Sequence, residues 1–298
     1  MSQELRSPVP PADRPIGLLA GWGRFPILFA EKARAMGLAV VCVGIRGEAD
    51  PILRSLTTKF HWAGVARMGR MIRCFKAAGV REIVMAGKIH KQIMYHPWRW
   101  LRLLPDWRTI RFWHRRWLKD NKDDSLLLDM IAEYASEGMM FRSALDFCPE
   151  LLVQPGVLTR RQPTLEEQAD IVFGWRLAKE MGRLDVGQSV AVKERAVIAV
   201  EAIEGTDRMI LRAGELCRSG SFTVVKVAKP QQDMRFDVPT VGPSTLRSMH
   251  EARARVLAVE AGKTIIIDEA ETLAEANRLG ILIAAFHDPE AELKRLAA

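Results

Sequence analysis

The amino-acid sequence predicts an α/β protein with two α/β domains, the first Rossmann-like with a parallel sheet and the second a mixed α/β domain. The length of 298 residues is about that of two domains. Short apolar runs alternate with helical patterns in the first part of the chain, and this alternation resumes beyond a loop that contains Pro155 and Pro163. We therefore expect a flexible arm over residues 1–15, an N-terminal domain over 16–150 and a C-terminal domain over 151–298.

Three apolar runs predict the buried strands of the N-terminal domain, and they are Ile16–Ala20, Leu38–Val43 and Glu82–Ala86. Between them, apolar residues at helical spacing predict two helices, one that starts at Pro26 and is ended by Gly37, and one from Gly69 to Ala78 that is stopped by Gly79. Because strands alternate with helices, we expect the strands to be parallel and their connections to be right-handed. A further helix is predicted over 123–137.

The C-terminal domain begins with a strong helix signal. Thr164 and Glu167 have the spacing of a capping box, and the helix that they start is expected to end at Met181. A long polar loop, Lys229–Gly242, follows a predicted strand over 221–228. The other predicted elements are a hairpin over 190–200, a helix from Ser244 to Ala254, strands over 256–259 and 264–268, a helix over 269–279 and a strand over 281–286.

The composition is that of an ordinary globular protein, with 48% hydrophobic and 27% charged residues, and it excludes a disordered chain or a collagen-like fibre. The chain has no apolar run of the roughly 18 residues that a membrane span needs, and its polar start lacks a signal-peptide core. The four cysteines stand far apart and form no metal-binding motif, which argues against a zinc or iron–sulfur centre. We expect them to be reduced thiols in the cytoplasm. These cysteines are Cys42, Cys74, Cys148 and Cys217.

Basic residues are concentrated in one segment, Tyr95–Lys122, of a chain with a net charge of +8. This Trp/Arg segment suits an anionic lipid surface, single-stranded nucleic acid, or a solvated helix whose tryptophans lie in the core. Pro105 is expected to divide it into two short helices. The segment holds five of the eight tryptophans, which are Trp98, Trp100, Trp107, Trp113 and Trp117.

The turn after the first predicted strand reads Gly21-Trp22-Gly23-Arg24-Phe25-Pro26. Backbone N–H groups at the start of a helix attract anions, and glycines allow a close approach. The turn lacks the dinucleotide fingerprint, because Pro26 replaces the third glycine and the next strand ends without an acidic residue, which argues against an NAD enzyme. It therefore predicts a phosphate-binding loop or a tight turn that needs small residues. Ala86-Gly87-Lys88 ends the third strand at the same sheet edge.

An acidic segment, Glu201–Asp207, gathers three carboxylates and a hydroxyl around Gly205. Such oxygens suit a hard cation such as Mg²⁺. The same residues also suit the start of a helix that Thr206 and Asp207 cap. Both interpretations stay open from the sequence.

The loop Lys229–Gly242 combines cations with carboxylates. Lys229 and Arg235 can neutralise a phosphate, while Asp233 and Asp237 can bind Mg²⁺ or activate water. A polar loop of this length after a buried strand is typically functional. The alternative is an ion-paired turn.

Together these segments resemble the UDP-2,3-diacylglucosamine pyrophosphatase family of lipid A biosynthesis, the type unrelated to the calcineurin-like phosphoesterases. The resemblance covers almost the whole chain, from Ile16 to near Phe286. The chain departs from the family in Trp98–Trp117, which is more basic and aromatic than expected. The segments that carry the resemblance are Lys229–Gly242, Asp185–Gln188, Glu204–Asp207, Gly17–Gly23 and the start of the helix at Asp123 and Asp124.

The resemblance implies a Mg²⁺-dependent hydrolase that splits UDP-2,3-diacylglucosamine into UMP and 2,3-diacylglucosamine 1-phosphate (lipid X), with water attacking the phosphorus next to the sugar. The family has two α/β domains with the substrate between them and an essential aspartate, which matches Asp237. A homodimer is also suggested. The expected partners are the glycolipid nucleotide and the anionic inner-membrane surface, where a cytoplasmic protein attaches peripherally; nucleic acid is not expected.

Asp237, Lys229 and Arg235 are the expected catalytic residues, with Asp237 either binding the metal or orienting the water. Two alternatives stay open: a nucleotide-sugar or lipid-binding protein without catalysis, and a nucleic-acid-associated protein that uses the Trp/Arg segment. Metal ligands are expected among Asp237, Asp233, Asp207 and Glu204. Substrate contacts are expected from Gly21, Trp22, Gly23, Ala86, Gly87, Lys88, Gln188, Thr206, Gln232 and Thr240.

Overall fold

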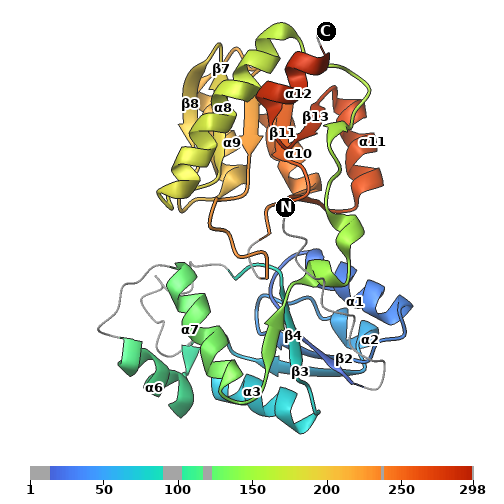
Figure 1. Ribbon diagram of the computed structural model, residues 1–298, viewed down its shortest axis with the longest axis vertical. Helices are drawn as coiled ribbons and strands as arrows, with labels where there is room; N and C mark the ends of the chain where they lie inside the picture. The colour runs from blue at the N-terminus through green and yellow to red at the C-terminus, as the bar shows by residue number, and fades with distance from the viewer. Residues whose placement is uncertain (1–13, 90–102, 117–122, 236–237, 297–298) are drawn as a thin grey trace. The chain divides into compact units, whose positions relative to one another are not determined.

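The computed structural model describes residues 14–89, 103–116, 123–235 and 238–296 (Figure 1). The chain divides into two compact units, with the boundary between Pro149 and Glu150. Most of the predicted arm lies outside the described residues. So do four residues singled out in the sequence, which are Trp98, Trp100, Trp117 and Asp237.

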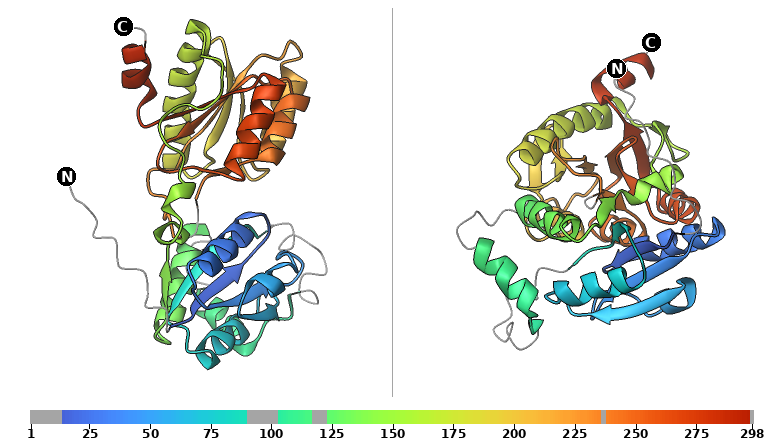
Figure 2. Two further views of the ribbon diagram at one scale, coloured as in Figure 1. Left: turned by 90° about the vertical axis from the view of Figure 1, so that its right-hand side faces the viewer. Right: turned by 60° about the horizontal axis from the view of Figure 1, so that its bottom comes forward.

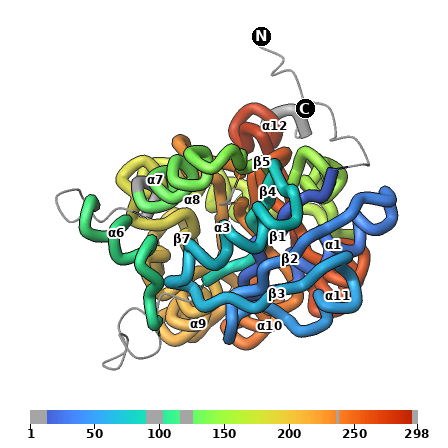
Figure 3. The backbone as a smooth tube through the Cα atoms, turned by 90° about the horizontal axis from the view of Figure 1, so that it is seen from below, coloured from blue at the N-terminus to red at the C-terminus, as the bar shows by residue number. Residues whose placement is uncertain are grey.

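The N-terminal unit is built on a sheet of five parallel strands in the order β3-β2-β1-β4-β5. Figure 3 shows this order across the sheet. The predicted Rossmann-like domain with a parallel sheet is thereby confirmed. The strands are β1 (Ile16–Ala20), β2 (Val40–Ile45), β3 (Lys59–Ala63), β4 (Glu82–Ala86) and β5 (Met140–Arg142).

The two outer strands, β3 and β5, were not predicted from the sequence. β3 reads Lys-Phe-His-Trp-Ala and is only partly buried, so it lacks the apolar run of an inner strand. β5 has three residues, too few for a periodic pattern. Each of the two strands is hydrogen-bonded to a single neighbouring strand. This pairing cannot be read from the sequence of the strand itself.

The helices of this unit are α1 (Phe25–Ala35), α2 (Leu53–Leu56), α3 (Met68–Ala77), α6 (Trp107–Arg116) and α7 (Asp123–Ala135). Figure 2 shows the blue α1 and the cyan α3 on opposite faces of the sheet. Strand side chains alternate between these faces. Leu19 and Ile83 pack with Phe75 of α3, whereas Phe29 of α1 meets Phe147 edge to face at 5.6 Å between ring centroids.

The chain segments that follow β1 and β4 pair with each other. Gly21 N donates to Ala86 O at 2.9 Å, and Trp22 and Lys88 exchange two backbone hydrogen bonds of 2.7 and 2.9 Å. A Cβ atom at Gly21 would lie 2.5 Å from Lys88 O. Gly87 has a φ of +90°, and a Cβ atom there would lie 2.7 Å from Trp22 O. Both glycines are therefore required by this close approach of two backbones.

The described part of the Trp/Arg segment is anchored on α3. Arg67, the N-cap residue of α3, makes no side-chain capping bond. Instead Asp106 Oδ2 accepts from Arg70 N at 2.9 Å and Thr109 Oγ1 accepts from Met68 N at 3.1 Å. Arg108 then pairs with Glu133 and Glu137, both at 2.7 Å. Two side chains of the segment thus cap a helix that precedes it in the chain.

The anchored helix α6 has one buried and one exposed side. Thr109 is buried and Phe112 packs against the core of the unit. On the other side, Trp107 is 76% exposed and Ile110 is 43% exposed. The interpretation that placed the tryptophans of this segment in the core is therefore wrong for Trp107, and Phe112 packs against the core instead.

The C-terminal unit contains a mixed sheet of six strands in the order β6-β13-β11-β9-β7-β8. Its middle strands β9, β11 and β13 are parallel, whereas β7 is antiparallel to β9 and to β8. The prediction of a mixed α/β domain is confirmed. The strands are β6 (Gly156–Val157), β7 (Ser189–Lys193), β8 (Ala196–Val200), β9 (Thr223–Lys226), β11 (Val256–Glu260) and β13 (Leu282–Phe286).

Two short strands, β10 (Thr240–Val241) and β12 (Ile265–Ile266), form a separate parallel pair. The strand predicted over 264–268 is therefore shorter than expected and stands outside the main sheet. Thr264 O accepts from Val153 N at 3.0 Å, and Ile265 forms a bridge with Leu152, so the chain at β12 pairs with the segment around Val153 and with β10 instead of with the main sheet.

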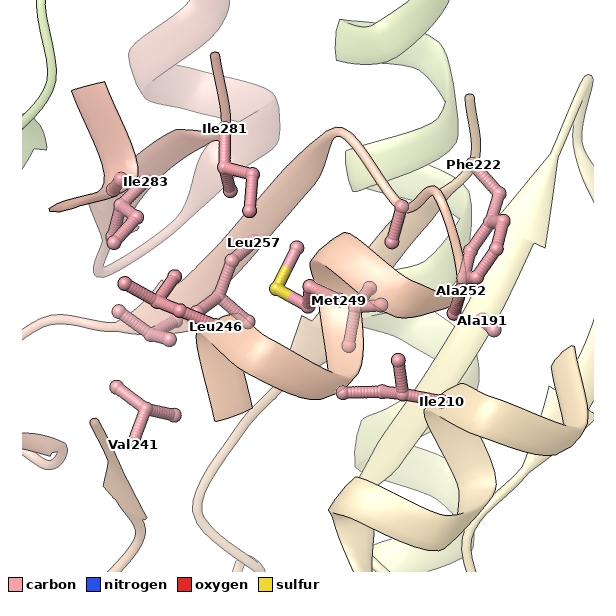
Figure 4. Packing of buried hydrophobic residues seen from close by; sticks show 14 of the residues in the cluster. Ala191, Ile210, Phe222, Val241, Leu246, Met249, Ala252, Leu257, Ile281 and Ile283 are labelled. Atoms are coloured by element: carbon pink, nitrogen blue, oxygen red, sulfur yellow. The ribbon is translucent and has the colours of Figure 1, made fainter. Parts of the chain in front are cut away.

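Helices cover both faces of the mixed sheet, and they are α8 (Leu165–Arg183), α9 (Thr206–Leu216), α10 (Pro243–Glu251), α11 (Glu269–Leu279) and α12 (Pro289–Leu296). The predicted capping box of Thr164 and Glu167 starts α8. The helix predicted from Ser244 begins one residue earlier, at Pro243, with Gly242 instead of Ser244 as its N-cap residue. Figure 4 shows Met249 of α10 in the core cluster of this unit.

No helix among the described residues is long and apolar enough to cross a membrane. The four cysteines form no disulfide. Burial raises the pKa of the Cys42 thiol in β2 to about 12, which makes it an unreactive core residue.

We expect Gly21→Ala to lower the free energy of unfolding of the N-terminal unit by about 2 kcal/mol or more, because its Cβ atom would meet a backbone oxygen that cannot move aside. Gly64→Ala is the matched control, since a Cβ atom there would meet its nearest neighbour at 3.7 Å, and it should change stability by less than about 1 kcal/mol. Urea unfolding followed by circular dichroism measures both. Equal stability of the two variants would contradict the paired arrangement of the β1 and β4 ends.

Candidate active site

Some backbone N–H groups of the Gly21–Pro26 turn are engaged in hydrogen bonds within the N-terminal unit. The N–H groups of Gly21 and Trp22 donate to Ala86 and Lys88, so these two donors do not face a phosphate. Gly23 has a φ of +110° and open space where a side chain would stand, and α1 starts without a side-chain cap. An anion at this turn would therefore meet Gly23 and the start of α1.

One edge of the mixed sheet gathers buried polar side chains. Lys226 ends β9 and Ser189 begins the antiparallel β7, and the two residues are paired in register. Glu260 ends the neighbouring strand β11, parallel to β9. Figure 1 shows the loop after β9 at this end of the sheet. The sheet topology thus collects a cation, a carboxylate and a hydroxyl that are far apart in the sequence.

Lys226 lies at the centre of a buried hydrogen-bond chain, which we call the Lys226 network and which comprises Ser189, Glu201, Thr206 and Lys226. Lys226 is 3% exposed and its Nζ donates to Thr206 Oγ1 at 2.7 Å. Because an ammonium group only donates, the Thr206 hydroxyl accepts that hydrogen bond and in turn donates one to Glu201 Oε1 at 2.9 Å. Ser189 Oγ lies 3.3 Å from the same hydroxyl. A buried cation and a buried carboxylate are thus linked through one hydroxyl group.

The network corrects the predicted role of Thr206. Thr206 is the first residue of α9, and Gly205, with a φ of +84°, is its N-cap residue. The N-cap residue is a glycine and has no side chain to cap the helix, and within the described residues no side-chain cap is formed; the Thr206 hydroxyl instead contacts Lys226 and Glu201. The start of α9 therefore presents its positive end beside a buried ammonium group, a combination that favours a phosphate.

Three buried polar atoms at this edge have no hydrogen-bond partner in the described part of the chain. They are Glu201 Oε2, Gln188 Oε1 and Gln232 Nε2. Gly187 has no room for a side chain, because a Cβ atom there would overlap the Glu201 carbonyl oxygen. A buried polar atom left unpaired costs stability, so these atoms point to a ligand or ordered water at the site.

A second ion pair, between Lys179 and Glu260, lies next to the Lys226 network at the same end of the sheet. Lys179 of α8 donates to Glu260 Oε2 at 2.5 Å and to Ala228 O at 3.0 Å. Burial raises the pKa of Glu260, but hydrogen bonds from Lys179 and Lys263 outweigh it and hold that pKa below its usual range. Glu260 also accepts from Ala228 N at 2.8 Å, so this pair fixes the start of the loop after β9.

The loop itself is braced by its own ion pairs. Lys229 Nζ contacts Asp185 Oδ1 at 2.5 Å, and Lys229 N donates to Gln232 Oε1 at 2.7 Å. Arg235 binds both carboxylate oxygens of Asp233. Although burial opposes it, this pairing lowers the pKa of Asp233. The predicted catalytic cations Lys229 and Arg235 thus lie on one loop, each beside a carboxylate.

The described candidate metal ligands do not form a cluster. Glu204 pairs with Arg212 at 2.5 Å, Asp207 accepts from Thr245 at 3.1 Å, and Asp233 is held by Arg235. Within the described ranges no three acidic, histidine or cysteine side chains gather as a metal site. These three carboxylates therefore do not fit Mg²⁺ as a set, and Asp237 lies outside the described residues.

Of the predicted substrate contacts, Gln188 and Thr206 lie with the Lys226 network, while Gln232 lies at the start of the loop. Thr240 donates instead to Val238 O at 2.9 Å. Sequence reasoning missed Ser189 and Lys226 as site residues, and it considered Glu201 only as one carboxylate of a possible cation site. The available signal was a lysine inside the apolar strand Phe-Thr-Val-Val-Lys-Val-Ala, where an unpaired charge would be costly.

Comparisons with known proteins match both units. A family model of the LpxI N-terminal domain matches residues 15–151, and one of the LpxI C-terminal domain matches residues 154–284. The chain is also 30% identical over 287 residues to a Caulobacter vibrioides protein named UDP-2,3-diacylglucosamine pyrophosphatase LpxI. That alignment covers 93% of this chain and 99% of the relative.

The resemblance inferred from the sequence motifs is therefore confirmed. Because both domain models match in order and the relative is covered almost from end to end, the chain belongs to the LpxI family.

Proposed function

We propose that this chain hydrolyses UDP-2,3-diacylglucosamine to lipid X and UMP in lipid A biosynthesis, with water attacking the phosphorus next to the sugar. The observation that carries the proposal is the nearly full-length similarity to a relative that is named for this pyrophosphatase activity. The Lys226 network supports it, because a buried ammonium group beside an uncapped helix start suits a diphosphate.

The cations of the C-terminal unit are proposed to act on the diphosphate. Lys226, Lys229 and Arg235 would offset the negative charge that develops as the bond to the leaving UMP breaks. Lys226 is held in place by Thr206, and Lys229 by Asp185, so neither needs to be ordered during the reaction. Asp237 is proposed to bind the metal or to orient the attacking water.

Substrate contacts are proposed on both units. Gln188 Oε1 and Gln232 Nε2, which have no partner among the described residues, would bind hydroxyl or phosphate groups of the substrate. The uridine end is proposed to meet the N-terminal unit near Gly23, where the turn leaves open space. Mg²⁺ is proposed as the cofactor; it would neutralise the diphosphate and activate water.

We further propose that the protein works in the cytoplasm, peripherally attached to the membrane surface that holds the acyl chains of its substrate. The exposed Trp107 and Ile110 of α6, beside the exposed Arg111, support this location. The homodimer stays a prediction. A non-catalytic nucleotide-sugar or lipid-binding protein is the alternative, and turnover distinguishes it.

The full chain should release UMP from detergent-dispersed UDP-2,3-diacylglucosamine when Mg²⁺ is present, and EDTA should stop the release. In water labelled with heavy oxygen, mass spectrometry should find the label in lipid X. Label in UMP would keep the substrate but contradict attack at the sugar-side phosphorus. Tight substrate binding without any UMP would favour the non-catalytic alternative.

Asp237→Asn should lower kcat by about a thousandfold or more, because it removes the charge of the proposed catalytic carboxylate while keeping its shape. Substrate binding, measured by equilibrium dialysis, should be retained. Asp50→Asn is the control, an exposed aspartate of the N-terminal unit whose loss should leave kcat near that of the parent. An Asp237→Asn protein with parental kcat would remove this residue from the mechanism.

Lys226→Met should lower kcat by about 100-fold or more, because a fixed cation at the diphosphate is lost. It should also destabilise the C-terminal unit by about 3 kcal/mol, since Glu201 stays buried without its cation. Adding Glu201→Gln to this variant should recover part of the stability but not kcat. Lys193→Met is the matched control, because Lys193 ends β7 at the opposite edge of the same sheet.

Recovery of kcat in the double variant would mean that Lys226 only stabilises the fold. A kcat in Lys193→Met as low as in Lys226→Met would show that any lysine of this sheet has the same effect, and would equally contradict a role at the diphosphate.

A further inference from the structure

A cavity of about 190 Å³ lies in the N-terminal unit, at the carboxyl ends of β2 and β3. It is separate from the paired ends of β1 and β4, where open α/β sheets commonly bind ligands. Among the described residues, three arginines line it, Arg46, Arg67 and Arg70, together with one acidic residue, Glu48. We call it the arginine cavity.

The three guanidinium groups of the arginine cavity have no partner among the residues that the structure describes. None of them makes a hydrogen bond or ion pair with another residue in the part of the chain that the structure describes. Elsewhere in the same unit, Arg108 and Arg142 each bind two carboxylates. Three unpaired guanidinium groups around one cavity form a site for an anion, and their fork geometry suits phosphate.

The other walls of the cavity are apolar. Ile45, Trp62 and Leu103 line it, as do Ile89 and Leu104, which are 45% and 52% exposed. Leu104 also has a φ of +36°, an unusual conformation for a large residue, and its side chain is left at the surface. The segment that carries Leu104 leads directly into α6, whose Trp107 is 76% exposed. Exposed apolar side chains are thus present both at the cavity and, three residues further along the chain, on this helix.

The walls decide the class of anion. Apart from the charged residues, no lining side chain in the described part of the chain can accept a hydrogen bond, so among these residues a ribose or a base would find few side-chain partners for its polar groups. The volume is also below the roughly 300–1,000 Å³ of sites for drug-sized molecules. A phosphate with the first methylene groups of a hydrocarbon chain satisfies both the arginines and the apolar walls.

We propose that the arginine cavity binds the phosphate of an anionic membrane phospholipid and thereby docks the N-terminal unit on the bilayer. The adjoining apolar surface of Leu104 and Trp107 enters the interface beside the head group. This proposal rests on the proposed function and specifies how the protein would contact the membrane. It is tested by vesicle binding alone, so a negative result can be told apart from a lack of UMP release.

The full chain is sedimented with vesicles of phosphatidylcholine, with or without phosphatidylglycerol. The cavity variant carries Arg46→Gln, Arg67→Gln and Arg70→Gln. The matched control carries Arg34→Gln, Arg73→Gln and Arg81→Gln, which remove the same charge from exposed positions of the same unit. We expect the parent to bind only the anionic vesicles, and the cavity variant to bind them about tenfold or more weakly than the control does.

A second pair of variants tests the apolar wall without loss of charge. Leu104→Asn suits the left-handed backbone, so it removes the side chain without straining the fold. Leu128→Asn is its control, since Leu128 of α7 is 48% exposed. Only Leu104→Asn should weaken vesicle binding.

Several results would overturn the proposal. Equal weakening in the two arginine variants would show general charge attraction instead of a site. Complete release from vesicles by low concentrations of inorganic phosphate would assign the cavity to the free anion. A higher KM for detergent-dispersed substrate in the cavity variant alone would assign it to the substrate, and loss of oligonucleotide binding with vesicle binding intact would assign it to nucleic acid.

Discussion

The buried ammonium group of Lys226 is the constraint on which the C-terminal unit depends. A charge taken out of water is costly unless it is paired and hydrogen-bonded. Thr206 and Glu201 meet this requirement, and in doing so they tie the start of α9 and the end of β8 to the end of β9. The loop that carries the predicted catalytic residues begins directly beyond this point, so its starting position is set by the same hydrogen bonds.

The carboxyl edges of the two sheets are organised differently. In the N-terminal unit the chain itself covers the edge at β1 and β4, and Gly21 and Gly87 are needed for that backbone contact. In the C-terminal unit the edge is lined by charged side chains and retains polar atoms without partners among the described residues. Unpaired atoms of this kind cost stability and are typical of a site that completes its hydrogen bonds with a ligand.

Much of the fold was predictable because its signals are local. The inner strands are continuous apolar runs, and the capping box of Thr164 and Glu167 starts α8 as expected. The outer strand β3 was missed, because Lys-Phe-His-Trp-Ala lacks the continuous apolar run of an inner strand and is held by the ladder of a single neighbour. The cap of α3 was also hidden, since Asp106 and Thr109 come from a segment that follows the helix by some distance in the chain. Neither the pairing of β3 nor the capping of α3 can be read from the residues of the element itself.

The sequence by itself determined the fold class and the family, because both depend on residue types in a fixed order along the chain: alternating strands and helices, and the Lys229–Gly242 motif. Only the tertiary structure decided which polar groups meet. Ser189, Glu201, Thr206 and Lys226 come together because an antiparallel strand places its start beside the end of a parallel one. That juxtaposition depends on strand order and direction, and these are set by packing between segments distant in the chain.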